Sequence, residues 1–303
     1  MKATTGPRKN EPELSIVIVN YNDRAHLPAC LSSLEKAVSG LSAEVILVDN
    51  QSGDGSPELV RSLFPWVRLI ENDKNVGYPQ ANNIGFRQSH GEYILFLNTD
   101  TVVPAAAPAA LLAEIKARPE VGAVGPALVH ENGRFQVSFG KKVGFLSEIR
   151  QKLILNPYYR IALRHSQKLR AVGWLSGACL LARRAAVETA GLFDEGFFLY
   201  FEDIDLCRRI TDKGFKLVFY PEVRISHVGG AATSVRRWQS RLEYRRSQLR
   251  FYRKHNSRSS LRLLRLYLKL AVLALGLGAS KQRDEDRKSF REGLRRILTG
   301  EDA

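Results

Sequence analysis

The sequence lacks three features that would each define a class of protein. Its cysteines number only three, Cys30, Cys179 and Cys207, and their wide spacing matches neither a disulfide framework nor a zinc site, which fits a reducing cytoplasm. The N-terminal segment is polar and has no apolar core of the signal-peptide type, so we expect residues 1–12 to be disordered. The uninterrupted apolar run after Lys269 has ten residues, short of the about 20 that a transmembrane helix needs.

Positive charge is abundant, and it is concentrated in the C-terminal part of the chain. The net charge is +15 over 303 residues, and residues 231–303 carry 19 lysines and arginines against 7 acidic residues. The remaining residues are nearly balanced, with 27 basic against 24 acidic side chains. A basic appendage of this kind indicates an anionic partner, either a membrane surface or a nucleic acid. No nucleic-acid recognition motif accompanies it, so we expect no nucleic-acid partner.

Apolar strands alternate with helical spacing over the first 120 residues. The strands expected there are residues 14–19, 44–48, 67–70 and 93–97. Such alternation predicts an α/β fold with a Rossmann-like, mostly parallel sheet flanked by helices. We expect one domain over residues 13–230, with halves 13–120 and 121–230, and a helical C-terminal region, 231–303. Within the second half, residues 174–181 are expected to form a single strand, and a helix is expected from about Glu202 to Lys213.

The strand that ends at Asn98, Thr99 and Asp100 carries the first candidate site. Ligands of parallel sheets bind beyond the carboxyl ends of the strands, and a carboxylate there can hold a divalent cation that also binds a diphosphate. The alternative is that Asp100 only caps the following helix. In the same way, Asp49 ends the second strand, where it either binds a nucleoside or only makes a turn.

A second cluster, Glu202, Asp203 and Asp205, follows a run of aromatic residues. Acidic residues are favoured in the first turn of a helix by its dipole. However, a carboxylate among bulky apolar groups has a raised pKa and makes a competent general base. His227, at the end of a strand and before two glycines, is a candidate metal ligand or phosphate contact.

Seven segments in order make the chain resemble the family 2 inverting glycosyltransferases of the GT-A fold, in particular their bacterial rhamnosyltransferase-like branch. The segments are Ser15–Tyr21, Val48–Ser56, Asn75–Gly85, Leu95–Thr101, Trp174–Leu180, Phe197–Leu206 and His227–Gly230. The resemblance covers roughly residues 14–230.

The resemblance implies roles for individual residues. Those implied for donor binding are Val19, Tyr21, Asp49, Ser52, Gly77, Asn82, Asn98, Thr99 and Asp100. Asp203 is the implied catalytic base, with Glu202 beside it, and Asp100 and His227 are the implied ligands of Mg²⁺ or Mn²⁺. Acceptor binding is implied for Trp174, Gly177 and Asp205, although Trp174 also suits a core position. Asn98 departs from the D-x-D pattern of the family, so we expect it to shape the turn rather than to bind the metal.

The expected function is transfer of a hexosyl or deoxyhexosyl group, with inversion, from a dTDP- or UDP-sugar in cell-surface polysaccharide synthesis. By resemblance, rhamnose is the leading sugar, and the acceptor is a saccharide or is lipid-linked. The alternative is a regulator of polysaccharide assembly that binds a nucleotide sugar without catalysis. A regulator would not need the acidic cluster at residues 202–205.

The basic tail permits two interpretations. Arg262, Arg265 and Lys269 are three and four residues apart and therefore share one face of a helix whose other positions are apolar. This pattern predicts a helix lying on an anionic bilayer, which would place the protein at the cytoplasmic face of the plasma membrane. The alternative is a helical pair that packs on the catalytic domain or on a second subunit in a homo-oligomer.

Overall fold

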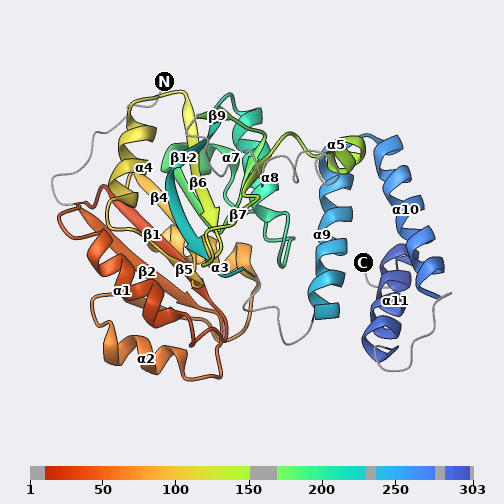
Figure 1. Cartoon of the computed structure of the whole chain (residues 1–303), viewed down its shortest axis with the longest axis horizontal. Coiled ribbons are helices and arrows are strands. Elements are labelled where there is room, and N and C mark those ends of the chain that lie inside the picture. Colours follow the sequence, from red (N-terminus) through yellow and green to blue (C-terminus); the bar gives the residue numbers. More distant parts are fainter. Residues whose placement is uncertain (1–10, 151–168, 230–236, 277–283, 301–303) are drawn as a thin grey trace.

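The computed structural model describes residues 11–150, 169–229, 237–276 and 284–300. Most of the N-terminal segment expected to be disordered, residues 1–12, lies outside these ranges. A body built on one large sheet and a region built from helices lie side by side along the longest axis (Figure 1). This arrangement agrees with the predicted α/β fold and its C-terminal helical appendage.

The large sheet combines a parallel half with a mixed half. Along its main path the strand order is β3-β2-β1-β4-β11-β6-β12-β5, with β7 paired to β6 and β9 to β12. The four strands of the parallel half are β1 (Leu14–Asn20), β2 (Ala43–Asp49), β3 (Arg68–Glu71) and β4 (Tyr93–Asn98). The other six are β5 (Thr101–Val102), β6 (Val121–Val129), β7 (Phe135–Gln136), β9 (Arg170–Ala171), β11 (Cys179–Arg183) and β12 (Lys216–His227). β11 runs antiparallel to both of its neighbours, so the parallel order ends at β4.

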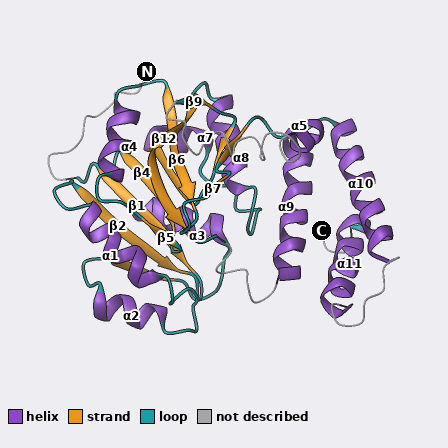
Figure 2. Cartoon of the chain, in the orientation of Figure 1, coloured by secondary structure: helices purple, strands orange, loops and turns teal. Residues whose placement is uncertain are grey.

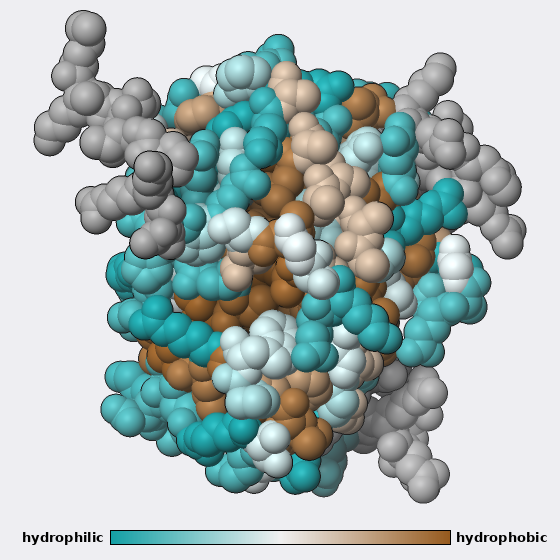
Figure 3. All heavy atoms as spheres, turned by 90° about the vertical axis from the view of Figure 1, so that its left-hand side faces the viewer, coloured by the Kyte–Doolittle hydropathy of each residue, from teal (hydrophilic) through white to brown (hydrophobic). Residues whose placement is uncertain are grey.

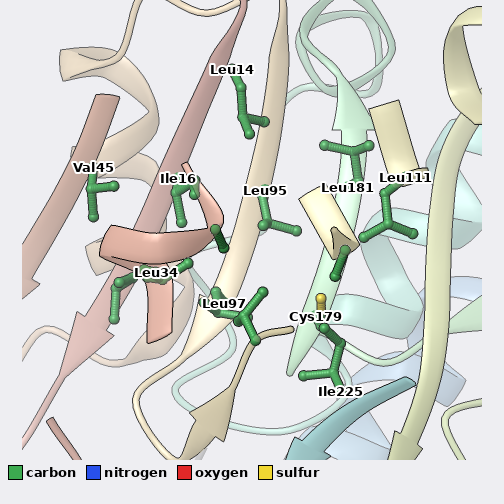
Figure 4. Packing of buried hydrophobic residues seen from close by; sticks show 14 of the residues in the cluster. Leu14, Ile16, Leu34, Val45, Leu95, Leu97, Leu111, Cys179, Leu181 and Ile225 are labelled. Atoms are coloured by element: carbon green, nitrogen blue, oxygen red, sulfur yellow. The ribbon is translucent and has the colours of Figure 1, made fainter. Parts of the chain in front are cut away.

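Helices cover both faces of this sheet (Figure 2). One face packs on α1 (Leu27–Ala37), α2 (Ser56–Leu63) and α4 (Ala107–Lys116), and the other on α3 (Tyr78–Gln88), α7 (Arg184–Ala190) and α8 (Glu202–Asp212). Alternate residues of β1 point to opposite faces, so Ile16 joins the first layer and Val17 the second. Figure 4 shows side chains of the first layer, Leu34 of α1 and Leu95 of β4 among them. Burial on both faces explains why these strands are continuous apolar runs.

The single strand expected over residues 174–181 is wrong. β10 (Trp174–Leu175) pairs with β8 (Phe139–Gly140) in a separate two-stranded sheet, and β11 begins only at Cys179. In the chain between them, the N–H of Gly177 donates a hydrogen bond to Asp203 Oδ2, at 2.8 Å. The break therefore brings backbone to a candidate catalytic carboxylate.

The described part of the C-terminal region forms three helices, whereas the alternative interpretation of the tail had a helical pair. They are α9 (Arg237–His255), α10 (Arg258–Gly276) and α11 (Asp284–Thr299), and the short α5 (Phe145–Arg150) contacts α10. Their own hydrophobic cluster includes Phe197 and Phe201, so the region is packed on the body. Within the described ranges, no helix is both long and apolar enough to cross a membrane.

The end of the molecule opposite the C-terminal helices presents teal hydrophilic atoms around a brown hydrophobic area (Figure 3).

Candidate active site

The carboxyl ends of β1, β2 and β4 meet at one edge of the sheet, as the sequence predicted. The register pairs Asn20 with Asp49, and Val19 with Asn98. Polar residues that end three separate strands are thereby brought together. Tyr21, the residue after β1, is 43% exposed there, whereas Val19 is buried.

Asp49 is a buried carboxylate that joins the first two loops. Its Oδ1 accepts a hydrogen bond from Asn20 Nδ2 at 2.7 Å, and its Oδ2 accepts one from the N–H of Ser52 at 2.8 Å. The Ser52 hydroxyl accepts further bonds from Asn20 Nδ2 and from the N–H of Asn22. These contacts are those of a turn residue, and they also fix the position of the carboxylate at the edge where a nucleoside would lie.

The loop after β4 is tied to the loop after β1 by another buried contact. Thr99 Oγ1 donates to Asp23 Oδ2 at 2.5 Å, and both residues are buried. Asp23 Oδ1 in turn lies 2.5 Å from His26 Nδ1. Thr99 therefore holds the segment that bears Asp100, rather than pointing its hydroxyl to solvent.

Asp100 and His227 come together because two strands distant in sequence pair. β5, which begins directly after Asp100, pairs antiparallel with the end of β12, and Thr101 lies opposite His227. His227 Nε2 is 3.2 Å from Asp100 Oδ1, while Asp100 Oδ2 accepts a hydrogen bond from the N–H of Gly229. Burial alone would raise the pKa of Asp100, but His227 and the N–H of Gly229 lower it below its usual value.

Gln136 sets which nitrogen of His227 carries a proton. Gln136 Nε2 donates to the backbone oxygen of His227, an atom that can only accept, so the amide oxygen Oε1 must face the ring. Oε1 lies 2.7 Å from His227 Nδ1 and therefore accepts its proton. Nε2, which faces Asp100, then carries either a second proton beside the carboxylate or a lone pair that a metal ion can use.

This pair fits a divalent cation of the Mg²⁺ or Mn²⁺ type. A carboxylate oxygen and an imidazole nitrogen 3.2 Å apart match neighbouring ligands of an octahedral ion, about 3.0 Å apart for bonds of about 2.1 Å. Among the described residues, no three His, Cys, Asp or Glu side chains gather into a metal site. Substrate phosphates and water would therefore have to supply the remaining ligands, which is how such ions are commonly held.

The start of α8 holds the second carboxylate site. Asp203 Oδ2 accepts the N–H of Gly177, and its Oδ1 accepts the N–H of Ile204 at 2.7 Å. Burial raises the pKa of Asp203, although these N–H groups oppose the shift. Glu202 is 6% exposed, and its Oε2 has no hydrogen-bond partner among the residues that the structure describes. Burial, reinforced by the charge of Asp203, raises the pKa of Glu202 well above its usual range, so the two N–H groups favour the anion on Asp203 and the proton on Glu202.

Two aromatic residues in a strained backbone conformation precede this pair. Tyr200 and Phe201 have φ values of 69° and 65°, a left-handed conformation that bulky residues rarely adopt. Such strain costs about 1–3 kcal/mol for each residue and persists only where packing enforces it. Both rings pack on α9, with centroid distances of 5.7 and 5.1 Å to Tyr244 and of 5.5 Å from Phe201 to Phe251.

Tyr78 links the two carboxylate sites. Its hydroxyl lies 2.9 Å from Asn98 Oδ1 and 3.1 Å from the carbonyl oxygen of Gly177, both acceptors for its single proton. Asn98 Nδ2 is 3.4 Å from His227 Nε2. A chain of polar contacts thus runs from Asp203 through Gly177, Tyr78 and Asn98 to His227. Asn98 is a hydrogen-bonding member of this chain, a fuller role than shaping the turn.

Three of the predicted binding residues have structural contacts of their own. A Cβ at Gly77, whose φ is +84°, would lie 2.8 Å from the carbonyl oxygen of Phe198, so only glycine fits there. Asn82 is fully buried and its Nδ2 donates to the carbonyl oxygen of Tyr78. Trp174 is half-buried and packs against the second core layer. Roles of these residues in binding donor or acceptor stay predictions.

Asp205, another predicted acceptor residue, has contacts with three basic side chains. It is fully buried, and its oxygens contact His255 Nε2 at 2.6 Å, Lys254 Nζ at 2.8 Å and Arg209 at 2.7 Å. Burial would raise the pKa of Asp205, but the hydrogen bond with His255 and the charges of Arg209 and Lys254 lower it. These contacts connect α8 to α9, and acceptor binding by Asp205 stays a prediction.

Reasoning from the sequence missed Asn20, Asp23, Tyr78 and Gln136. Asn20 is the last residue of β1 and Asp23 lies three residues beyond it, so their position at a strand end was a usable signal. Tyr78 lies in a matched segment as well, but its hydroxyl is directed by contacts across 20 and 99 residues. Gln136 lies in a two-residue strand and gives no signal in the sequence.

Comparisons with known proteins bear on the family of the chain. Residues 15–191 match the family Glycosyl transferase family 2. An N-acetylglucosaminyl-diphospho-decaprenol L-rhamnosyltransferase of Mycobacterium tuberculosis is 32% identical over 233 residues, which cover 71% of this chain and 75% of that protein. The O-antigen biosynthesis protein RfbC of Myxococcus xanthus is 33% identical over 235 residues, covering 73% of this chain and 18% of that protein.

Two solved structures share the fold at low sequence identity. A mannosyltransferase from Pyrobaculum calidifontis, in complex with GDP-Man and Mn²⁺, has a TM-score of 0.60 at 17% identity and covers 96% of this chain and 87% of its own. GalNAc-T7, with UDP, GalNAc and Mn²⁺, has a TM-score of 0.57 at 18% identity, over 96% and 57% of the two chains. The fold is therefore GT-A, as expected, and the chain belongs to glycosyl transferase family 2.

Proposed function

We propose that this glycosyltransferase moves a hexosyl or deoxyhexosyl group from a dTDP- or UDP-sugar to a saccharide or lipid-linked acceptor, with inversion at the anomeric carbon. Rhamnose is the proposed sugar and a lipid diphosphate-linked saccharide the proposed acceptor, because the Mycobacterium tuberculosis relative bears both in its name. We place the reaction on the cytoplasmic side of the membrane, where nucleotide sugars are present. The three cysteines are buried and free, which fits this reducing compartment.

One observation carries the proposal: Tyr78 connects, through hydrogen bonds, the site of Asp100 and His227 with the site of Glu202 and Asp203. Asp203 accepts the proton of the acceptor hydroxyl, and its raised pKa makes it a stronger base than an ordinary aspartate. The hydroxyl oxygen bonds to the anomeric carbon as the bond from that carbon to the diphosphate breaks. The electron pair leaves with the nucleoside diphosphate, so the configuration inverts in one step.

Asp100 and His227 would hold the divalent cation. When bound, that ion supplies positive charge against the growing negative charge on the leaving diphosphate. Gln136 keeps His227 Nε2 directed at Asp100. Glu202, which holds its proton more tightly than Asp203, can donate a hydrogen bond to an acceptor oxygen while Asp203 remains the base.

The test is a panel of nucleotide sugars, first by thermal shift with Mn²⁺ and then by NMR of the product. We expect a dTDP- or UDP-deoxyhexose to raise the melting temperature, and the product to have the anomeric configuration opposite to that of the donor. A retained configuration would contradict the single displacement. Full activity after treatment with a chelator would remove the metal from the proposal.

The alternative of a regulator without catalysis has no support in the relatives described above, whose names are those of transferases and of an O-antigen biosynthesis protein. It also gives no reason for a carboxylate pair with raised pKa values at the start of α8.

A further inference from the structure

α10 has two apolar faces, and only one of them is covered. Leu264 and Leu268 are buried in the hydrophobic cluster of the C-terminal region, at 2% and 0% exposure. On the opposite side of the helix, a row of large apolar side chains is exposed. This row, the outer face of α10, comprises Leu263, Leu266, Tyr267, Leu270 and Leu273, with exposures of 45% to 64%. At 3.6 residues per turn, these five residues form one continuous stripe.

Positive charge borders the outer face on both sides. Arg262, Arg265 and Lys269 follow one edge of the stripe, and all three are exposed. At the other edge, the guanidinium of Arg245, from α9, lies 5.9 Å from the centre of the Tyr267 ring. The sequence of α10 contains four basic residues and no acidic one, so no charge within the helix neutralises these edges.

α10 belongs to the helical region and not to the body built on the sheet. α10 contacts α5, α9 and α11 with its inner side, and it lies at the edge of the molecule farthest from the strands (Figure 1). An exposed apolar stripe of this size marks an interaction surface.

We propose that the outer face of α10 docks on an anionic lipid bilayer. Leucines and a tyrosine between two basic borders suit the boundary of headgroups and acyl chains, where the side chains insert and the lysine and arginine heads stay with the anionic headgroups. A second copy of the chain fits this surface less well, because a twofold pairing of two α10 helices would bring like charges together. The docking surface is separate from the sugar-transfer site, so its test does not depend on the donor or on turnover.

Vesicle flotation of the full-length protein tests the proposal. We expect the protein to float with vesicles of phosphatidylcholine mixed with phosphatidylglycerol, and only weakly with phosphatidylcholine alone. At about 1 M salt, where the screening length falls to about 3 Å, most of the binding should be lost. The double variant L266E/L270E should lose binding to the mixed vesicles at low salt by at least about tenfold, because two leucines that insert are replaced by charges.

The matched control is L63E, at an equally exposed leucine of α2, 60% exposed and on the other side of the molecule. It should float like the wild type. Circular dichroism and melting curves establish that each variant is folded. The charge variant R262Q/K269Q, which leaves every leucine in place, should weaken partition by about tenfold or more.

Two results would overturn the proposal. One is unchanged flotation of folded L266E/L270E, which would remove the outer face from membrane binding. The other is a wild-type dimer in sedimentation equilibrium that L266E/L270E dissociates, without flotation of the wild type. That outcome would assign the outer face to a second copy of the chain.

Discussion

Asp100 and the pair Glu202 and Asp203 are acids with little or partial exposure to solvent, yet their surroundings shift their pKa values in opposite directions. Asp100 faces an imidazole and accepts a backbone N–H, and its pKa is lowered. Glu202 has an oxygen without a partner, and both members of the pair have raised pKa values. The end of β4 therefore stabilises negative charge and suits a cation, whereas the start of α8 suits proton transfer. The same residue types serve different chemistry because of what packs on them.

Asp203→Asn probes the proton-transfer side and has the largest expected effect. The amide keeps the size of the side chain but cannot take up a proton, so kcat should fall by about 10²–10⁴-fold. Binding of donor and Mn²⁺ should remain, because Asp100 and His227 are untouched. Asp212→Asn, at the half-exposed end of the same helix, is the matched control and should leave turnover unchanged. Near-normal turnover of Asp203→Asn would remove this residue from the base role.

Gln136→Leu probes the cation side. Loss of the amide frees His227 to rotate or to change its protonated nitrogen, so Mn²⁺ affinity should fall by about 10–100-fold. Electron paramagnetic resonance of free Mn²⁺, titrated with protein and nucleoside diphosphate, measures this directly and without turnover. Gln88→Leu, at an exposed glutamine of α3, serves as the control. Unchanged Mn²⁺ affinity in Gln136→Leu would show that the amide does not position the ring.

Glu202→Gln tests the sign of the pKa shift through stability and has the smallest expected effect. The folded protein holds the Glu202 proton more tightly than the unfolded chain, in which the pKa is about 4.3. Wild-type stability should therefore fall as the pH rises from about 4.3 through the raised pKa of the folded state. Gln is neutral throughout, so the melting temperature of the variant should exceed that of the wild type by an increment that grows over this window.

The control for this experiment is Glu58→Gln, since the side chain of Glu58 is 73% exposed on α2. Its melting temperature relative to the wild type should stay nearly constant with pH. If the difference between Glu202→Gln and the wild type is also constant with pH, then Glu202 titrates as an ordinary glutamate and the contrast with Asp100 is lost.

The location of both carboxylate sites could be predicted from the sequence, because it follows from local patterns. Polar residues at the ends of apolar strands located Asp49 and Asp100, and the acidic first turn after an aromatic run located Glu202 and Asp203. The matching segments then indicated the family. These features depend on residues close together in the chain and on the rule that parallel strands share a ligand-binding edge.

The remainder depends on contacts that no local pattern encodes. Gln136 reaches His227 across 91 residues, and Asp205 is occupied by residues of a helix about 50 positions away. Gly177, between β10 and β11, donates its N–H to Asp203, 26 residues further along the chain. In each case the partners are distant in the sequence and are brought together by the packing of strands and helices.

The strained turn at Tyr200 and Phe201 makes the catalytic domain depend on the C-terminal region. The family match ends at residue 191, before the proposed base Asp203, and the Phe201 ring rests on Tyr244 and Phe251 of the C-terminal region. An exchange of C-terminal regions between relatives would therefore remove the support of the turn that precedes Asp203, along with the helices. A chimera joined before α9 should fold its sheet yet lose the alignment of Asp203, whereas a junction beyond His255 would leave that support in place.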